Sequence, residues 1–154
     1  MFRTILLALL IPIFSLIGKL LSKKYEYNRI FFEDFLTFLS ILKSEVDFSQ
    51  KTVAEILDEF ENKRGEFYNF AKNFLFFNSS KKPYYVKESD YVFVFNFFSN
   101  FGKLDKYTQK SSIENVIIKT NSIYENAKTL EKTNTNLYFK LGFFFGLFIF
   151  ILLI

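Results

Sequence analysis

The chain of 154 residues contains no cysteine, no histidine and no tryptophan. Without cysteine it forms neither a disulfide nor a zinc–thiolate site, and it has no thiol nucleophile. Without histidine it lacks the most common general base and the serine–histidine–aspartate triad. The remaining candidates for catalysis are carboxylates, Lys, Tyr and Ser, and the carboxylate pairs lack the further ligands at one-turn spacing that an all-α metal site needs. We therefore expect no catalytic residues, no cofactor and no metal.

Charge is distributed unevenly along the chain. Lys and Arg total 20 and Asp and Glu total 16, and all 16 carboxylates lie between Glu26 and Glu131. In this central part the two signs nearly balance, whereas a nucleic-acid-binding protein would present a basic face or stripe. Nucleic acid is therefore not an expected partner. Lys23, Lys24 and Arg29 follow an apolar block directly, which is typical of charges that flank a membrane segment.

The first apolar block runs from Phe2 to Gly18 and extends to Leu21 if Lys19 snorkels. These roughly 20 residues, at about 1.5 Å each, span a hydrocarbon core of about 30 Å. We interpret residues 2–21 as a transmembrane anchor. The alternative is a cleaved signal peptide, although no small-x-small cleavage site precedes the charged residues.

The second apolar block is the uncharged run from Leu141 to Ile154. With Lys140 snorkelling, residues 137–154 reach about 27 Å, so we expect a C-terminal transmembrane anchor in the form of a tail anchor. Lys and Arg are concentrated after the first block and before the second. The positive-inside rule then places the segment between the blocks in the cytoplasm and both termini outside.

Residues 22–136 are predicted to form a cytoplasmic bundle of about five helices, so that the fold class is all-α with a transmembrane helix at each end. The first bundle helix is indicated by apolar residues at helical spacing, with two apolar sides. Its members are Phe31, Phe32, Phe35, Leu36, Phe38, Leu39, Ile41, Leu42 and Val46.

Later helices are predicted from local signals. Thr52 and Glu55 form a capping box at the start of one helix. The run 91–98 has the β-branched and aromatic residues of a strand, but no second such run exists to pair with it, so we predict a helix. No Gly or Pro occurs from Asp105 to Lys140, and this last helix is expected to continue through the second apolar block as a rod of roughly 50 residues and about 75 Å.

Three stretches have a recognisable spacing. The first, Leu42 to Val53, contains Glu45 one residue before an apolar position. The second places Gly102, Asp105 and Gln109 in a Gly-x-x-Asp-x-x-x-Gln order, with Phe97 before and Ile113 after it. The third is Leu141-Gly142-x-x-x-Gly146-Leu147, which leads into an aliphatic run. In their order and content these stretches resemble the stage III sporulation protein AB family of endospore-forming Firmicutes.

The resemblance implies a function. Members of this family are similar in their cytoplasmic domain to the platform proteins of type II secretion and type IV pilus machines. A member is expected to engage a secretion-type ATPase encoded beside it, together with other membrane subunits of a channel between mother cell and forespore. The expected location is the mother-cell-side membrane around the forespore, in contact with membrane lipid.

Each candidate residue also has a simpler interpretation. Glu45, Asp105 and Gln109 form a candidate partner interface, but Glu45 can be a surface charge, Asp105 an N-cap and Gln109 a local hydrogen-bonding residue. Gly142 and Gly146 either mark close packing of membrane helices or reflect the tolerance of such helices for glycine. Two other functions stay open: a small two-span protein of the holin type and an enzyme at the membrane surface.

Overall fold

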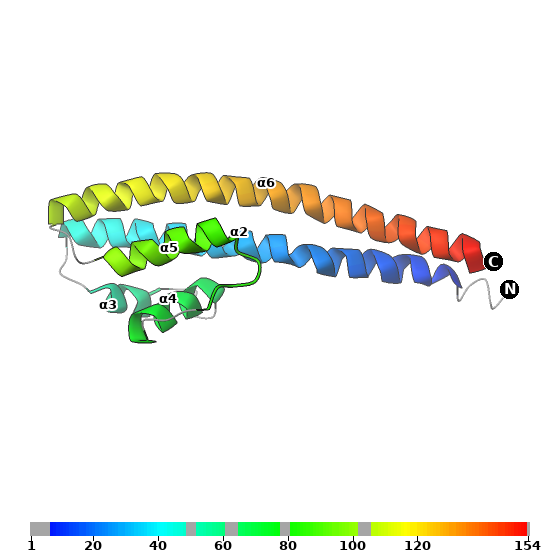
Figure 1. The fold of residues 1–154 in the computed structure, drawn as a ribbon, viewed down its shortest axis with the longest axis horizontal. Coiled ribbons are helices and arrows are strands. Elements are labelled where there is room, and N and C mark those ends of the chain that lie inside the picture. The colour runs from blue at the N-terminus through cyan, green and yellow to red at the C-terminus, as the bar shows by residue number, and fades with distance from the viewer. Residues whose placement is uncertain (1–6, 49–51, 61–64, 78–80, 102–105, 154) are drawn as a thin grey trace. The chain divides into compact units, whose positions relative to one another are not determined.

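The computed structural model describes residues 7–48, 52–60, 65–77, 81–101 and 106–153. Within these ranges every regular element is an α-helix (Figure 1). The elements are α2 (Leu10–Phe48), α3 (Val53–Asp58), α4 (Glu66–Phe77), α5 (Glu88–Asn100) and α6 (Lys106–Leu153). The predicted all-α class is confirmed for these residues, with five helices, whereas the transmembrane helix expected at each end of a five-helix bundle stays a prediction.

The chain divides into two compact units. The first, here called the helix pair, comprises residues Met1–Tyr27 and Asn126–Ile154, and the second, here called the bundle, comprises Asn28–Glu125. The predicted domains 2–21, 22–136 and 137–154 stay predictions, because their boundaries concern the position of a membrane.

The core of the bundle is dominated by phenylalanine. Phe67 is fully buried and its ring centroid lies 5.3–5.6 Å from those of Phe31, Phe35 and Phe38 on α2. Phe98 on α5 packs against the same layer, 5.8 Å from Phe38. Such ring pairs add to the stabilisation that burying a large apolar surface provides. Six of the nine residues predicted for the apolar stripe of α2 are buried, and Leu36 and Ile41 are half-buried. Val46 lies outside the residues whose side chains the structure describes.

The start of α3 shows the predicted capping box. The backbone N–H of Glu55 donates to Thr52 Oγ1 over 3.3 Å, and the backbone N–H of Thr52 donates to Glu55 Oε2 over 2.7 Å. Two N–H groups that the helix itself leaves without a partner are thus satisfied. The helix then buries Ile56 and Leu57.

The segment with strand-like composition is a helix, as predicted. Within α5 the buried residues are Val94, Phe97 and Phe98, which share one helical face because three to four residues make one turn. The helix ends at Phe101, whose backbone N–H donates to the Phe97 carbonyl oxygen over 2.9 Å. Tertiary packing of this aromatic face against α2 and α4 outweighs the β propensity of its residues.

The two long helices contribute to both units. α6 has 48 residues, which confirms the predicted rod. α2 is one helix of 39 residues, whereas the sequence analysis treated the first apolar block and the next helix separately. Within the bundle the two helices run antiparallel, since Lys43 Nζ near the end of α2 pairs with Glu114 Oε1 near the start of α6 at 2.9 Å.

Candidate functional site

The two backbones of the helix pair approach each other closely at three glycines. A Cβ atom at Gly142 would overlap the carbonyl oxygen of Phe14, and one at Gly18 would overlap that of Tyr138. A Cβ atom at Gly146 would lie only 2.8 Å from Ile11 Cα. Residue numbers rise on α2 as they fall on α6, so the pair is antiparallel. Small residues that let two backbones approach are the common packing device of membrane helices.

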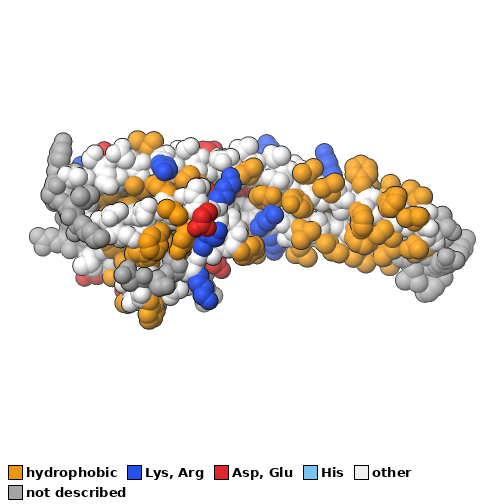
Figure 2. Space-filling model, viewed as in Figure 1, with side chains coloured by type: hydrophobic (Ala, Val, Ile, Leu, Met, Phe, Trp, Pro, Cys, Tyr) orange, Lys and Arg blue, Asp and Glu red, His pale blue; other side chains and the backbone are white. Residues whose placement is uncertain are grey.

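Two serines of the helix pair are buried between the helices, whereas most of its large apolar side chains are exposed. Ser15 and Ser22 are 6% and 3% exposed, and their hydroxyls donate to the backbone carbonyls of Ile11 and Lys19 over 2.9 and 2.8 Å. Many large apolar side chains of the same helices are exposed and gather on much of the visible surface of this unit (Figure 2). The most exposed of them are Leu16, Leu20, Phe144, Ile151 and Leu152. In a water-soluble helix pair the large apolar side chains would face the partner helix instead of the surroundings.

The C-terminal part of α6 is long and apolar enough to cross a membrane. Only 6% of its apolar stretch is buried inside the protein, so it is not the covered core helix that such a stretch forms in many water-soluble proteins. Among the residues that the structure describes, α6 is the one helix with these properties. Residues 2–6 of the N-terminal apolar block lie outside the described part, and the N-terminal anchor stays a prediction.

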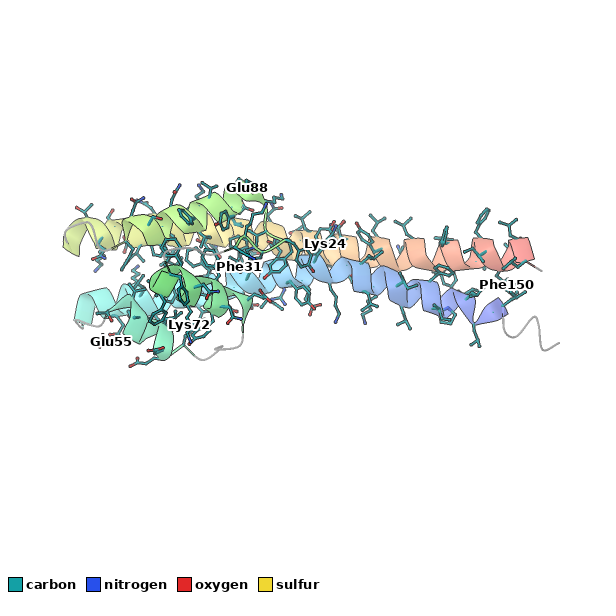
Figure 3. The ribbon with its side chains drawn as sticks, turned by 60° about the horizontal axis from the view of Figure 1, so that its bottom comes forward. Lys24, Phe31, Glu55, Lys72, Glu88 and Phe150 are labelled. Carbon is teal, nitrogen blue, oxygen red and sulfur yellow. The ribbon has the colours of Figure 1, made fainter. Side chains whose placement is uncertain are left out.

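Tyrosine and lysine meet where the apolar part of the helix pair ends. The ring centroids of Tyr25 and Tyr138 are 6.1 Å apart, and Lys24 Nζ lies 5.1 and 5.7 Å from these two centroids. Figure 3 labels Lys24 on α2. The pKa of Tyr25 is raised above its ordinary value. The main cause is the side-chain hydrogen bond with Tyr138, and the second is partial burial. Tyr and Lys together are typical of the level at which a membrane helix meets the headgroups.

The residues of the candidate partner interface lie in the bundle. Glu45 is half-buried near the end of α2, and Gln109 is half-buried in the first turn of α6. The Lys43–Glu114 ion pair brings these two helix ends alongside each other, so both residues lie at the same end of the bundle. Asp105 lies outside the described residues.

Gln109 lines an open cleft of about 220 Å³ between α5 and α6. Its other polar lining residues are Asn96, Asn100 and Ser112, and Phe93, Phe97, Phe101 and Val116 supply apolar walls. The sequence analysis missed the two asparagines and the serine, because only the packing of α5 on α6 brings them to Gln109. A largely apolar cleft that is also lined by three amide side chains suits a side chain of a partner protein.

The sequence analysis also missed Gly18, Ser15 and Ser22, although their four- and three-residue spacing inside an apolar run was a usable signal. In the part of the chain that the structure describes, no three of the side chains Asp, Glu, His and Cys come close enough to hold a metal ion.

The comparisons with known proteins give one match. The family model for stage III sporulation protein AB matches residues 76–154, which is just over half of the chain. No curated protein and no solved structure matches it. The matched range includes the stretches around Gln109 and around Gly142 and Gly146 but not the one around Glu45, and the likeness to secretion platform proteins stays a prediction. The family consists of structural components of a sporulation complex and is not a known enzyme family. The chain belongs to the stage III sporulation protein AB family and is a sporulation-related protein.

Proposed function

We propose that this protein is a membrane-anchored platform component of a sporulation complex. In this proposal both helices of the helix pair span the membrane that surrounds the forespore on the mother-cell side. The bundle lies in the cytoplasm and passes the position or motion of a secretion-type ATPase to a channel. The observation that carries the proposal is the composition of the helix pair, in which Ser15 and Ser22 are buried and most large apolar side chains are exposed.

The helix pair is stable in lipid for three reasons. Every outward Leu or Phe that stays in water forgoes about 1.5–3 kcal/mol that burial would provide, and a hydrocarbon surrounding removes that cost. The two serine hydroxyls are satisfied by carbonyls of their own helix, which matters because lipid offers no hydrogen bonds. The glycine contacts supply close van der Waals packing where no hydrophobic force holds helices together.

The absence of cysteine allows a direct test of topology. Lys81 is exposed in the bundle, and Lys81→Cys introduces the first thiol of the chain. The variant is expressed in non-sporulating cells, where the protein inserts into the plasma membrane, and a membrane-impermeant maleimide should label it only after the cells are permeabilised, because the bundle is proposed to lie in the cytoplasm. A second variant, Thr4→Cys, should be labelled in the same cells while they are intact, because the N-terminus is proposed to lie outside. Labelling of Lys81→Cys in intact cells would invert the proposed topology.

The cleft at Gln109 supports contact with a partner. Amide groups in the lining of a largely apolar cleft combine hydrogen bonding with an apolar anchor site, as in the centre of protein interfaces. We propose that the secretion-type ATPase encoded beside this protein docks here. Gln109→Ala should weaken co-purification with that ATPase, and the exposed Asn121 on the same helix gives the matched control Asn121→Ala. Equal recovery of the ATPase with both variants would remove this docking site.

A further inference from the structure

The charged residues of the helix pair are concentrated at one of its ends. Residues 19–27 on α2 and 128–140 on α6 together contain six lysines and two glutamates, and both segments belong to the helix pair. They lie at the same end because Tyr138 of α6 packs against Gly18 of α2 and the two helices run antiparallel. Anionic lipid is attracted to such an excess of positive charge beside a membrane segment.

The ammonium group of Lys24 is held in a defined position at this end. Its Nζ atom lies 5.1 Å from the ring centroid of Tyr25 and 5.7 Å from that of Tyr138, which is within the range of a cation–π attraction. Lys24 also donates a hydrogen bond to the Tyr25 hydroxyl, and in the described part of the chain it forms no ion pair. An ammonium group has three donors, so Lys24 keeps donors for a ligand from the surroundings.

The hydroxyl of Tyr138 is a second donor beside this ammonium group. The hydroxyls of Tyr25 and Tyr138 are hydrogen-bonded to each other, and this bond raises the pKa of Tyr25. A hydrogen bond that the protonated group donates raises the pKa of that group, so Tyr25 donates and the Tyr138 oxygen accepts. The Tyr138 proton stays available, because the described residues supply no acceptor for it. Lys24 is exposed and Tyr138 is half-buried, so a ligand can reach both donors.

We propose that Lys24 and Tyr138 form a site for one phosphate group with a net negative charge, supplied by the headgroup of an anionic lipid. The inference rests on the proposed membrane anchoring, because the first predicted anchor ends at Leu21 and the second begins at Leu137, which places the site beside the headgroups. A lipid phosphate has two unesterified oxygens, which accept hydrogen bonds from the ammonium and the hydroxyl group at the same time. Since the two donors come from different helices, the bound phosphate also ties α2 to α6.

The neighbouring Lys23 provides a matched control. It is exposed like Lys24 and carries the same charge, but the contacts with the two tyrosine rings are made by Lys24. A site made of defined donors depends on Lys24 much more than on Lys23, whereas a general attraction of lysine for anionic lipid depends on both equally. This difference separates the proposed site from the overall positive charge of this end.

The experiment counts the lipid that the purified full chain retains. Phosphatidylglycerol is titrated into the protein in a neutral detergent, and native mass spectrometry measures the bound lipid for the wild type and for Lys24→Gln, Lys24→Arg, Tyr138→Phe and Lys23→Gln. Phosphatidylcholine, whose net charge is zero, gives the background. Inorganic phosphate, added as a competitor at constant ionic strength, tests whether the free anion takes the same site.

Lys24→Gln and Tyr138→Phe should each weaken the apparent affinity for the first phosphatidylglycerol about tenfold, because each removes a hydrogen bond to a charged group. Lys24→Arg should retain most of the affinity, since it keeps a charged donor. Lys23→Gln should lose at most about fivefold, the share of one surface lysine. Displacement of the lipid by inorganic phosphate would support the site and extend it to the free anion.

Equal losses in Lys24→Gln and Lys23→Gln, or an unchanged affinity of Tyr138→Phe, would overturn the inference. Extraction of membranes with alkaline carbonate tests the anchoring separately. A chain that stays in the extracted membrane while both lysine variants bind equally contradicts only the phosphate site. A chain that carbonate releases contradicts the anchoring and the site that rests on it.

Discussion

The backbone of α6 at Gly142 touches the carbonyl oxygen of Phe14 on α2 so closely that position 142 has no room for a Cβ atom. The obstructing atom belongs to the backbone of a helix, which cannot rotate away as a side chain does. A methyl group here therefore forces the two helices apart. If Gly142 is required for close helix packing, and is not merely tolerated, its replacement by alanine must lower the stability of the helix pair.

Gly142→Ala should destabilise the helix pair by about 1–3 kcal/mol, the usual cost of overpacking. The measurement is the thermal unfolding of the purified protein in detergent. The matched control is Leu141→Ala, since Leu141 is 56% exposed on the neighbouring position and its side chain faces the surroundings. If Gly142→Ala melts like the control, glycine at this position reflects only the tolerance of membrane helices for it.

The buried ring of Phe67 gives a prediction for the bundle. Its ring contacts those of Phe31, Phe35, Phe38, Phe60 and Phe98. Phe67→Ala should lower the free energy of unfolding by about 3–5 kcal/mol, because it removes a large apolar side chain and leaves a cavity. Denaturant unfolding measures this loss. Phe76→Ala is the control, since that ring is 63% exposed, and a similar loss in both variants would contradict the described core.

The hydrogen bond between Tyr25 and Tyr138 predicts a dependence on alkaline pH. Because the pKa of Tyr25 is raised in the folded protein, the folded state holds this proton more tightly than the unfolded state. The resulting stabilisation is fully present below the ordinary tyrosine pKa of about 10 and is lost as pH rises through the higher folded value. Above pH of about 10 the wild type should therefore lose stability more steeply than Tyr25→Phe. The control Tyr84→Phe removes an exposed hydroxyl and should follow the wild type.

Local sequence signals predicted most of the helices but not the course of α2. The capping box at Thr52 and the apolar stripe from Phe31 to Leu42 depend on neighbours within a few turns, and such short-range patterns are visible in sequence. Hydropathy divides α2 at Leu21, because its two parts bury their apolar faces against different surroundings, whereas its backbone continues to Phe48. Hydropathy reports the environment of a helix and not its continuity.

Sequence patterns likewise identified only some of the residues in each candidate site. Gly142 and Gly146 were visible as a Gly-x-x-x-Gly pattern, but the partner position Gly18 depends on which turn of α2 faces α6. Asn96 and Asn100 belong to the cleft at Gln109 only because α5 packs on α6. Pairwise helix packing of this kind is a property of two distant segments, and a single sequence gives no measure of it.

The residue directly before α6 yields the last prediction, which separates stability from partner binding. Asp105 directly precedes Lys106 in the sequence, and the sequence analysis interprets it either as an N-cap or as part of a partner interface. If it acts as a cap, Asp105→Asn should be nearly neutral and Asp105→Ala should lower stability by about 1 kcal/mol, because Asn caps as well as Asp. Thermal unfolding measures both variants, and co-purification with the ATPase is measured on the same samples. If Asp105→Asn weakens co-purification while its melting temperature equals that of the wild type, the carboxylate contacts a partner and the capping interpretation is insufficient.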